Sequence, residues 1–149
     1  MNAGELCSRT VVTATREMSI MDAARLMRDR HVGSLVVIED NGDWVEPVGI
    51  ITDRDIVIEV IAENVSVDNV TVGDIMTYAL LKVNVQDSIL DTAQRMRARG
   101  VRRIPVIEST GELTGILALD DILELLSEEM SLLTRVTTRE AEQEKKKRA

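Results

Sequence analysis

Aromatic residues are nearly absent from this chain of 149 residues, which has no phenylalanine, one tryptophan and one tyrosine. A hydrophobic core must therefore be built from aliphatic side chains, since 44% of the residues are still apolar. The shortage also removes the aromatic platform on which single-stranded nucleic acids stack. The net charge of −8 has the wrong sign for a protein that neutralises a phosphate backbone. Both features argue against nucleic acid as the main partner.

Cysteine and long apolar runs are also scarce. The single cysteine, Cys7, cannot form a disulfide within the chain. The longest apolar runs are only a few residues, whereas a membrane-spanning helix needs about 20. No basic start precedes an apolar stretch, as it would in a secretion signal. We therefore expect a cytoplasmic protein without a membrane segment.

Catalytic constellations are missing as well. The chain has one histidine, His31, and no Cys-x-x-Cys pair, Walker loop or cluster with metal-ligand spacing. Carboxylates are plentiful, but without a base partner they do not indicate an activated nucleophile. The sequence predicts neither an enzyme nor a metal centre, and no catalytic cofactor.

What the sequence does contain is a repeat. When the chain is shifted by 69 residues against itself, and by 66 after a three-residue slip, identical residues coincide along most of its length. The coincident pairs include Gly4 and Gly73, Ser19 and Ser88, Asp22 and Asp91, Met27 and Met96, Val37 and Val106, Gly49 and Gly115, and Asp55 and Asp121. Such a register indicates duplication. Because a unit of about 60 residues buries little surface alone, we expect the two copies to share a core.

Each copy predicts the same order of elements: strand, helix, strand, strand, helix. A Ser-x-x-Asp box at Ser19 or Ser88 begins the first helix, and apolar residues at helical spacing indicate a buried face. Runs of β-branched residues between turn residues indicate buried strands. The strands are expected at 10–13, 34–38 and 48–51, then at 79–83, 104–107 and 115–119, and the closing helices at 54–62 and 121–136.

This order predicts an α+β fold in which each copy lays a small sheet against two helices. Pairing the copies about a pseudo-twofold axis buries the open sheet faces and leaves two equivalent clefts. The domains expected are 3–63 for the first copy, 72–127 for the second, and 128–149 for a C-terminal helix and charged tail. Residues 64–68 form the connector. The tail from Thr137 onward is expected to fray, because it is charged on all sides.

Two stretches carry a resemblance to a known family. GIITDRDIV (49–57) and GILALDDIL (115–123) each follow a strand of the type VGSLVVIE (32–39) or VRRIPVIE (101–108), and both resemble the hallmark of CBS domains. The resemblance covers residues 3–127. It implies a tandem pair, called a Bateman module, that typically forms a homodimer. It also implies that AMP, ADP, ATP or a similar adenosyl compound binds in the clefts as a regulatory ligand.

The resemblance assigns the ribose contacts to two aspartates. Asp55 and its counterpart Asp121 open a helix directly after a strand, where a carboxylate can accept hydrogen bonds from both ribose hydroxyls. Thr52 adds a hydroxyl toward the ribose or the α-phosphate. The second copy has Ala118 at that position and loses the contact. The alternative role for Thr52, Asp53 and Asp55 is helix capping, for which their residue types are well suited.

Arginine side chains are the expected phosphate ligands, because a guanidinium group holds phosphate oxygens in a fixed fork. Arg102 is the main candidate, with Arg103 beside it in the second copy's cleft. The family architecture implies that Arg30 and His31 approach that same cleft and that Arg99 faces the other one. The alternative for the helical arginines is a solvated surface.

Adenine is expected to contact apolar side chains and backbone groups. The candidates, chosen by their position within the motifs, are equally suitable as core residues. They are Val11, Val12, Val36, Ile50, Leu80, Leu81 and Ile116. The sequence leaves open whether the ligand is AMP, ADP, ATP, NAD or S-adenosylmethionine, and which cleft it enters.

Three functions follow from these observations. The first is a sensor that binds an adenosine nucleotide and acts in trans on an unidentified partner protein. Its closing helix would carry the signal through an apolar stripe, formed by Ile122, Leu125, Leu126, Met130 and Leu133. The second is a ligand-free dimerisation scaffold, which Ala118 favours and Thr52 with Asp55 disfavours. The third, nucleic-acid binding through the lysine-rich tail, is opposed by the net charge.

Overall fold

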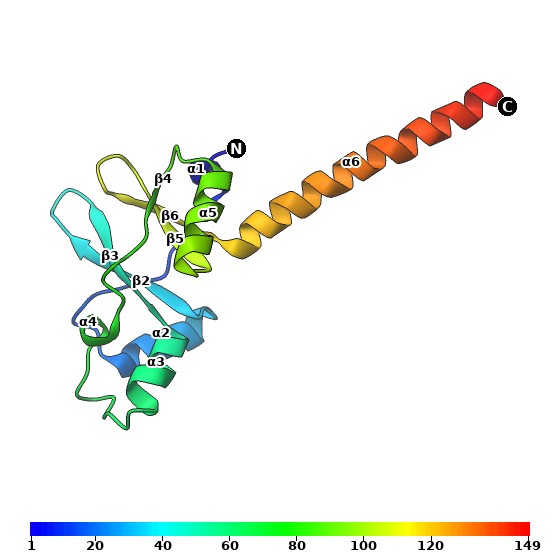
Figure 1. Ribbon diagram of the computed structural model, residues 1–149. Coiled ribbons are helices and arrows are strands. Elements are labelled where there is room, and N and C mark those ends of the chain that lie inside the picture. Colours follow the sequence, from blue (N-terminus) through cyan, green and yellow to red (C-terminus); the bar gives the residue numbers. More distant parts are fainter.

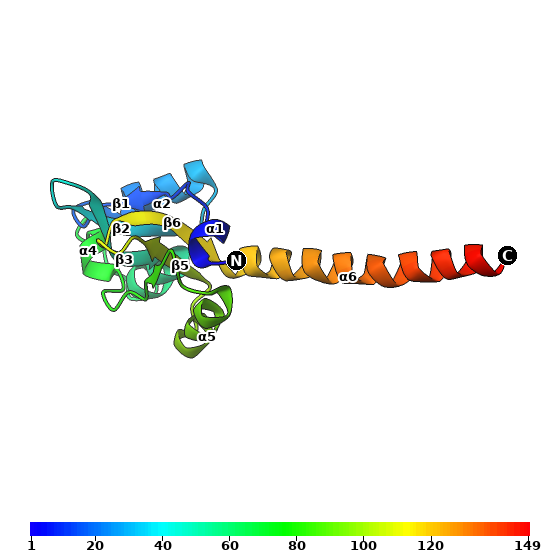
Figure 2. The same cartoon turned by 90° about the horizontal axis from the view of Figure 1, so that it is seen from above.

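The computed structural model describes residues 1–149 as two similar halves from which a long C-terminal helix projects (Figures 1 and 2). The elements of the first half of the chain are α1 (Ala3–Leu6), β1 (Thr13–Ala14), α2 (Ile20–Arg30), β2 (Ser34–Asp40), β3 (Val45–Thr52), α3 (Asp53–Ile56) and the π-helical turn η1 (Val57–Ile61). Those of the second half are α4 (Val72–Ile75), β4 (Val83–Asn84), α5 (Ile89–Arg99), β5 (Arg103–Ile107), β6 (Leu113–Ala118) and α6 (Leu119–Arg148).

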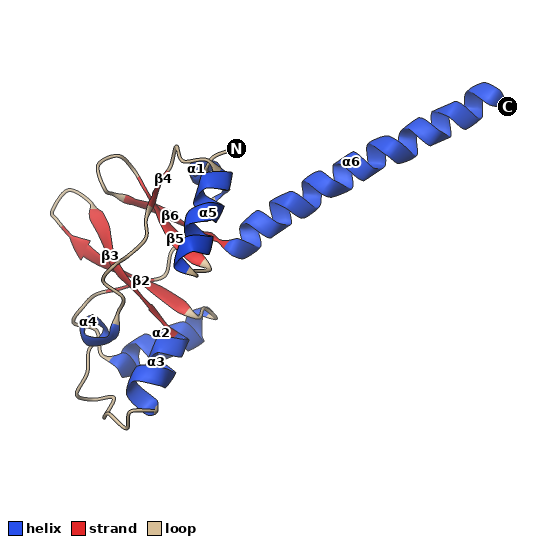
Figure 3. Ribbon diagram, in the orientation of Figure 1, coloured by secondary structure: helices blue, strands red, loops and turns tan.

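Each half contributes a three-stranded mixed sheet. The strand orders are β1-β2-β3 and β4-β5-β6, and in both sheets the first pair is parallel and the second antiparallel. The two ladders even share an irregularity, since the register shifts after Val37 in β2 and after Val106 in β5. Strand β3 contacts strand β6, so the sheets meet, with helices on their outer sides (Figure 3). The predicted α+β class with two small sheets is confirmed.

The main helix of each half begins where the sequence predicts. Ser19 Oγ accepts a hydrogen bond from the Asp22 N–H at 3.0 Å, and Ser88 Oγ accepts one from the Asp91 N–H at 3.1 Å. A hydroxyl at this position satisfies one of the backbone N–H groups that the first helical turn leaves unpaired. Both α2 and α5 therefore start directly from a short polar turn.

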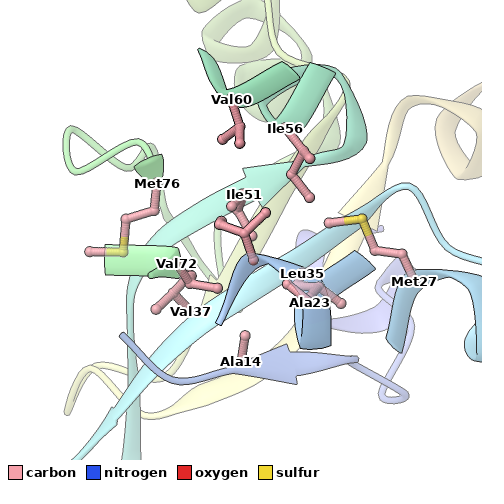
Figure 4. Close-up of a cluster of buried hydrophobic side chains, with 11 residues drawn as sticks. Ala14, Ala23, Met27, Leu35, Val37, Ile51, Ile56, Val60, Val72 and Met76 are labelled. Atoms are coloured by element: carbon pink, nitrogen blue, oxygen red, sulfur yellow. The ribbon is translucent and has the colours of Figure 1, made fainter. Parts of the chain in front are cut away.

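Each sheet covers its own aliphatic core. In the first half, side chains from α2, β2, β3, α3 and η1 pack together (Figure 4). Fully buried members of this cluster include Ile20, Leu35, Ile51 and Val60. The second core is built from the corresponding elements and contains Val83, Met96, Ile104, Val106, Leu117 and Ile122. Burying one such side chain contributes about 1.5–3 kcal/mol to the stability of the fold. Two aliphatic clusters can therefore act as hydrophobic cores without aromatic residues.

The opening segment of each repeat lies on the opposite half of the molecule. Ala3 and Cys7, at α1, belong to the second core. Val72 and Met76, at α4, belong to the first core (Figure 4). Neither core is complete without residues from the other repeat, which makes the two halves mutually dependent. The repeat boundaries in the sequence therefore do not coincide with the packing units in space.

Backbone hydrogen bonds hold the exchanged segments in place. Ser8 and Ile116 bond in both directions, each with an N···O distance of 2.9 Å. Thr77 and Ile50 form the equivalent pair, at 2.9 and 3.4 Å. The Gly4 N–H also donates to the Val85 carbonyl at 3.0 Å. The exchange is thus a regular extension of both sheets' outer strands.

The strands expected at 10–13 and 79–83 are wrong in extent. Only Thr13–Ala14 and Val83–Asn84 pair with a neighbouring strand. The residues before them run from the exchanged segment on one half to the sheet of the other half, and they cross between the halves instead of pairing. The one-turn helices α1 and α4 were not predicted, because four residues are too few for a periodic pattern.

The expectation that the tail frays from Thr137 is also wrong, since α6 continues to Arg148. Oppositely charged side chains at helical spacing support this part: Arg139 pairs with Glu142 at 3.5 Å, and Arg148 pairs with Glu144 at 2.9 Å. Basic residues in the last turn also suit the negative end of the helix dipole. None of the helices combines the length and the apolar character that a bilayer-spanning segment needs.

Replacing Gly115 by alanine is expected to lower the free energy of unfolding by about 1–3 kcal/mol through overpacking. A Cβ atom at Gly115 would lie 2.5 Å from the Ser8 carbonyl oxygen and 2.7 Å from Cys7 Sγ, both in the exchanged segment. Urea unfolding measures the loss. The control Thr114→Ala removes only one hydrogen bond, to Glu108, worth about 1 kcal/mol. A smaller loss for Gly115→Ala than for the control would contradict the tight contact.

Burial raises the pKa of the Cys7 thiol above its ordinary value; Arg9 opposes the rise and Asp121 adds to it. Because the pKa is higher in the folded state, the associated stability is present below the unfolded-state pKa of about 8.5. It is lost as the pH rises through the folded-state pKa. Between about pH 8 and pH 10, the unfolding free energy should therefore fall more steeply in the wild type than in Cys7→Ala. Parallel pH profiles would argue against a buried thiol.

Candidate functional site

A cavity of about 460 Å³ lies where the two halves meet. Its walls are Gly33, Ser34, Ile50, the turn 52–55 after β3, Thr77, and the segment 100–103 that joins α5 to β5. Gly33, Ser34, Ile50 and the turn 52–55 come from the first repeat. Thr77 and segment 100–103 come from the second repeat. The volume falls within the range of about 300–1,000 Å³ that is typical of small-molecule sites.

The turn between β3 and α3 is held by two reciprocal hydrogen bonds. Thr52 Oγ1 accepts one from the Asp55 N–H at 3.1 Å, and Asp55 Oδ2 accepts one from the Thr52 N–H at 2.9 Å. This is a capping box, so the capping role considered for these residues is present. Asp55 Oδ1 has no hydrogen-bond partner within the chain. The carboxylate of this cavity-lining residue therefore caps the helix with one oxygen, while the other has no partner within the chain.

Positive charge exceeds negative charge along the cavity wall. Three guanidinium groups, those of Arg54, Arg102 and Arg103, line it together with the carboxylates of Asp53 and Asp55. Guanidinium groups are the side chains best suited to hold phosphate oxygens. An overall acidic protein thus carries a local patch that suits an anion.

Arg102 also connects the cavity to the C-terminal helix. Its Nη2 atom lies 3.5 Å from Oδ1 of Asp120, in the first turn of α6. The side chains are 70% and 71% exposed, and an exposed ion pair contributes at most about 1 kcal/mol. An anion in the cavity can therefore compete with Asp120 for Arg102 at little cost.

The cavity brings together four of the predicted site residues: Ile50, Thr52, Asp55 and Arg102. The repeat pattern predicts Arg102 in the second copy's cleft, whereas the structure places it at the turns of both copies. It lines the cavity beside Thr52, and its carbonyl accepts a hydrogen bond from the Leu119 N–H at 2.8 Å. The reason is that the start of β5 lies at the seam between the two halves.

The other predicted site residues lie outside this cavity. Arg30 and Arg99 are exposed at the last positions of α2 and α5. His31 caps the end of α2 in a left-handed conformation with φ 56°, and Val36 is buried in β2. The remaining predicted residues are all half-buried: Val11, Val12, Leu80, Leu81, Ile116, Ala118 and Asp121.

Sequence reasoning missed Thr77 as a lining residue. It reaches the cavity because the exchanged segment bonds to the backbone of Ile50. A signal was available, since the shift of 69 residues places Ser8 on Thr77 and so gives both copies a hydroxyl at this point. Arg54 and Val101 were also missed, because neither stands out by residue type within its motif.

The equivalent turn of the second half offers fewer polar groups. Asp121 Oδ2 accepts a hydrogen bond from the Ala118 N–H at 2.9 Å, but Ala118 has no hydroxyl with which to accept one in return. Asp120 stands where the first copy has Arg54, so a negative charge replaces a positive one. The two clefts are therefore chemically different. No group of three or more His, Cys, Asp or Glu side chains is placed to hold a metal ion.

Two repeated α+β halves with exchanged opening segments and a polar cavity at their seam define a tandem domain pair. The family model of the CBS domain matches the chain twice, at residues 3–62 and 72–128. The chain belongs to the CBS domain family and carries two copies of the domain. The resemblance inferred from the two Gly-containing motifs is thereby confirmed.

Known proteins with the same pair include relatives of quite different size. An uncharacterized protein of Methanopyrus kandleri is 32% identical over 125 residues, which is 84% of this chain but 62% of that protein. The chain thus spans less than two thirds of this relative's length. Hypoxic response protein 1 of Mycobacterium tuberculosis is 34% identical over 128 residues, covering 86% of this chain and 82% of that protein.

A similar solved structure contains bound ligands. The CBS domain pair of protein MJ0100, in complex with 5'-methylthioadenosine and S-adenosyl-L-methionine, is 25% identical to this chain. The two structures align with a TM-score of 0.75, over 87% of this chain and 98% of the other. That relative therefore binds adenosyl compounds on the fold described above.

Exchanging the cap residues of the two copies is expected to move stability in opposite directions. Thr52→Ala removes the hydroxyl that accepts from Asp55, which should cost about 1 kcal/mol of unfolding free energy. Ala118→Thr introduces the missing hydroxyl at the start of α6 and should add about 0.5–1 kcal/mol. Urea unfolding of both variants measures the difference. A loss of stability in Ala118→Thr would show that the second turn has no room for the cap.

Proposed function

We propose that this chain is a cytoplasmic regulatory module that binds an adenosine-containing ligand and acts in trans on a partner protein, as a homodimer. One observation carries the proposal: a cavity of about 460 Å³ is lined by three arginines and by Asp55, one of whose carboxylate oxygens has no hydrogen-bond partner within the chain. This combination matches the two polar parts of a nucleotide, the ribose diol and the phosphate. It also agrees with the adenosyl ligands of the related MJ0100 structure.

Each part of the ligand has a suitable group in the cavity. The free Oδ1 of Asp55 accepts a hydrogen bond from a ribose hydroxyl, and a charge-assisted bond of this kind is among the stronger ones. Arg102 and its neighbour Arg103 hold the phosphate. Ile50 and Val101 supply the apolar surface for the adenine ring. In this assignment Thr52 serves mainly to keep the Asp55 carboxylate in place.

The charge of the wall favours an anionic ligand. S-adenosylmethionine carries a positive sulfonium group, which three arginines at the cavity would repel. AMP, ADP and ATP carry negative phosphates, which the same arginines attract. We therefore expect this chain to prefer phosphate-bearing nucleotides to the sulfonium compound that binds to MJ0100.

The composition of the cavity favours binding without chemistry. Its walls hold carboxylates, guanidinium groups and hydroxyls but no histidine or cysteine. A general base or an activated nucleophile would need such a partner within hydrogen-bond reach. The effect of the ligand is then conformational: a phosphate that takes Arg102 away from Asp120 alters the first turn of α6.

Thermal unfolding with millimolar AMP, ADP, ATP, NAD, S-adenosylmethionine and 5'-methylthioadenosine tests the proposal. A ligand at 100 times its Kd should stabilise the protein by about 2.7 kcal/mol, which corresponds to a rise in Tm of roughly 5–10 °C at this size. The rise should occur with a phosphate-bearing nucleotide. It should disappear in Asp55→Asn, whose amide oxygen still caps the helix.

Two further variants test, in the same experiment, whether Arg102 contacts the phosphate and whether the ligand uses only the first copy's carboxylate. Arg102→Gln should lower the affinity for phosphate-bearing ligands by about tenfold or more, because a hydrogen bond to a charged group is worth about 1.5–3 kcal/mol. It should leave 5'-methylthioadenosine, which has no phosphate, unaffected. The control Asp121→Asn changes the equivalent carboxylate of the other turn and should keep the full shift. If no compound raises Tm, the ligand-free dimerisation scaffold becomes the better description.

A further inference from the structure

Each exchanged segment is closed by a hydrogen bond from a side chain at its end to a glycine carbonyl near its start. In the second segment the Tyr78 hydroxyl donates to the Gly73 carbonyl. In the first segment Arg9 Nη2 donates to the Gly4 carbonyl at 2.9 Å. The shift of 69 residues places Arg9 on Tyr78 and Gly4 on Gly73, so the two closing bonds are equivalent. The copies therefore share the contact although the donor differs in chemistry.

The glycine at the start of each segment is also the point at which the segment is held on the opposite half. The Gly73 N–H donates to the Arg16 carbonyl at 2.9 Å, and the Gly4 N–H donates to the Val85 carbonyl at 3.0 Å. The contacts are close, since a Cβ atom at Gly73 would lie 3.1 Å from the Arg16 carbonyl oxygen. Each closing bond thus ties the end of a segment to its anchored start.

Tyr78 makes a second contact that Arg9 does not have. The centre of its ring lies 5.6 Å from the Arg16 guanidinium carbon, within the range of a cation–π interaction. The same guanidinium group pairs with Glu39, with an N···O distance of 3.7 Å. The hydroxyl and the ring of Tyr78 therefore hold the end of the second segment at two separate points.

Thr77, which precedes Tyr78, is the residue that this segment contributes to the cavity. Its N–H donates to the Ile50 carbonyl at 2.9 Å, and its carbonyl accepts from the Ile50 N–H at 3.4 Å. The Thr77 hydroxyl has no hydrogen-bond partner within the chain, whereas the hydroxyl of its counterpart Ser8 bonds to the backbone of Thr10. The hydroxyl of Thr77 is thus available to a ligand.

We infer that Tyr78 is a positioning residue for the ligand site. By bonding to the Gly73 carbonyl and packing on Arg16, it holds Thr77 beside Ile50, where the Thr77 hydroxyl bonds to a polar group of the nucleotide. The inference rests on the proposed function, because it assigns Thr77 to that nucleotide. Arg9 holds Ser8 in the same way, but Ser8 does not line the described cavity. Only the Tyr78 bond should therefore affect the affinity for the ligand.

Hydrogen exchange of the full-length protein without ligand tests whether each closing bond holds its own segment. Tyr78→Phe keeps the ring on Arg16 and removes only the donor, and the matched control Arg9→Met removes the other donor. The Thr77 N–H should exchange about fivefold faster in Tyr78→Phe, as expected for the loss of one hydrogen bond. The Ser8 N–H should respond only to Arg9→Met. An unchanged Thr77 rate in Tyr78→Phe would overturn the inference.

Calorimetric titration with AMP, ADP and ATP then tests the link to the ligand. Tyr78→Phe and Thr77→Val should each raise the Kd of the nucleotide that binds by about two- to tenfold, the range of one hydrogen bond. Because Tyr78 acts through Thr77, the double variant should bind no more weakly than Thr77→Val alone. Arg9→Met should keep the wild-type Kd although it loses an equivalent bond.

The outcomes separate this inference from the proposed function. A nucleotide that binds to Tyr78→Phe with wild-type affinity leaves the proposed function intact and overturns the positioning role. Equal losses of affinity in Tyr78→Phe and Arg9→Met would overturn it as well, because they indicate general loosening of the fold. Additive losses in the double variant would show that Tyr78 does not act through Thr77. If no nucleotide binds to the wild type, the proposed function fails, and the exchange rates alone decide whether Tyr78 holds Thr77.

Discussion

The reciprocal exchange of opening segments is the constraint on which the rest of the structure depends. Each aliphatic core is completed by residues from the other repeat, Ala3 and Cys7 in one case and Val72 and Met76 in the other. Domains of about 60 residues bury too little surface to be stable alone. The exchange removes that difficulty, because the two halves cannot separate without opening both cores. It also leaves Gly115 without room for a side chain.

The same exchange builds the cavity. Thr77 arrives there with the exchanged segment of the second repeat, and the turn at Thr52 and Asp55 comes from the first. A site assembled from both repeats is sensitive to their relative position, which is the physical requirement for a ligand to act as a signal. Since Arg102 lines the cavity and also pairs with Asp120, it connects the cavity wall to the first turn of α6.

The turns of the two repeats differ in chemistry. The first keeps the hydroxyl, the carboxylate and Arg54 around one turn, which suits ligand binding. The second replaces the hydroxyl with Ala118 and extends its closing helix by several turns beyond the corresponding helix of the first. Duplication supplied two equivalent turns. One of them borders the described cavity, and the other is the base of a long helix with an exposed apolar stripe.

The sequence by itself determined the duplication, the α+β order of elements, the starts of α2 and α5 and the position of Thr52 and Asp55 at a turn before a helix, because these rest on local patterns of residue type and spacing. It did not reveal the exchange, the role of Thr77 or the position of Arg102 at both turns. Those features depend on which surfaces meet after folding. The extent of α6 was misjudged for a different reason, because its ion pairs at helical spacing are local in the sequence but were outweighed in the prediction by the highly charged composition of the tail. Only the tertiary structure decides the exchange and the make-up of the cavity, because contacts between distant segments leave no periodic trace in the chain.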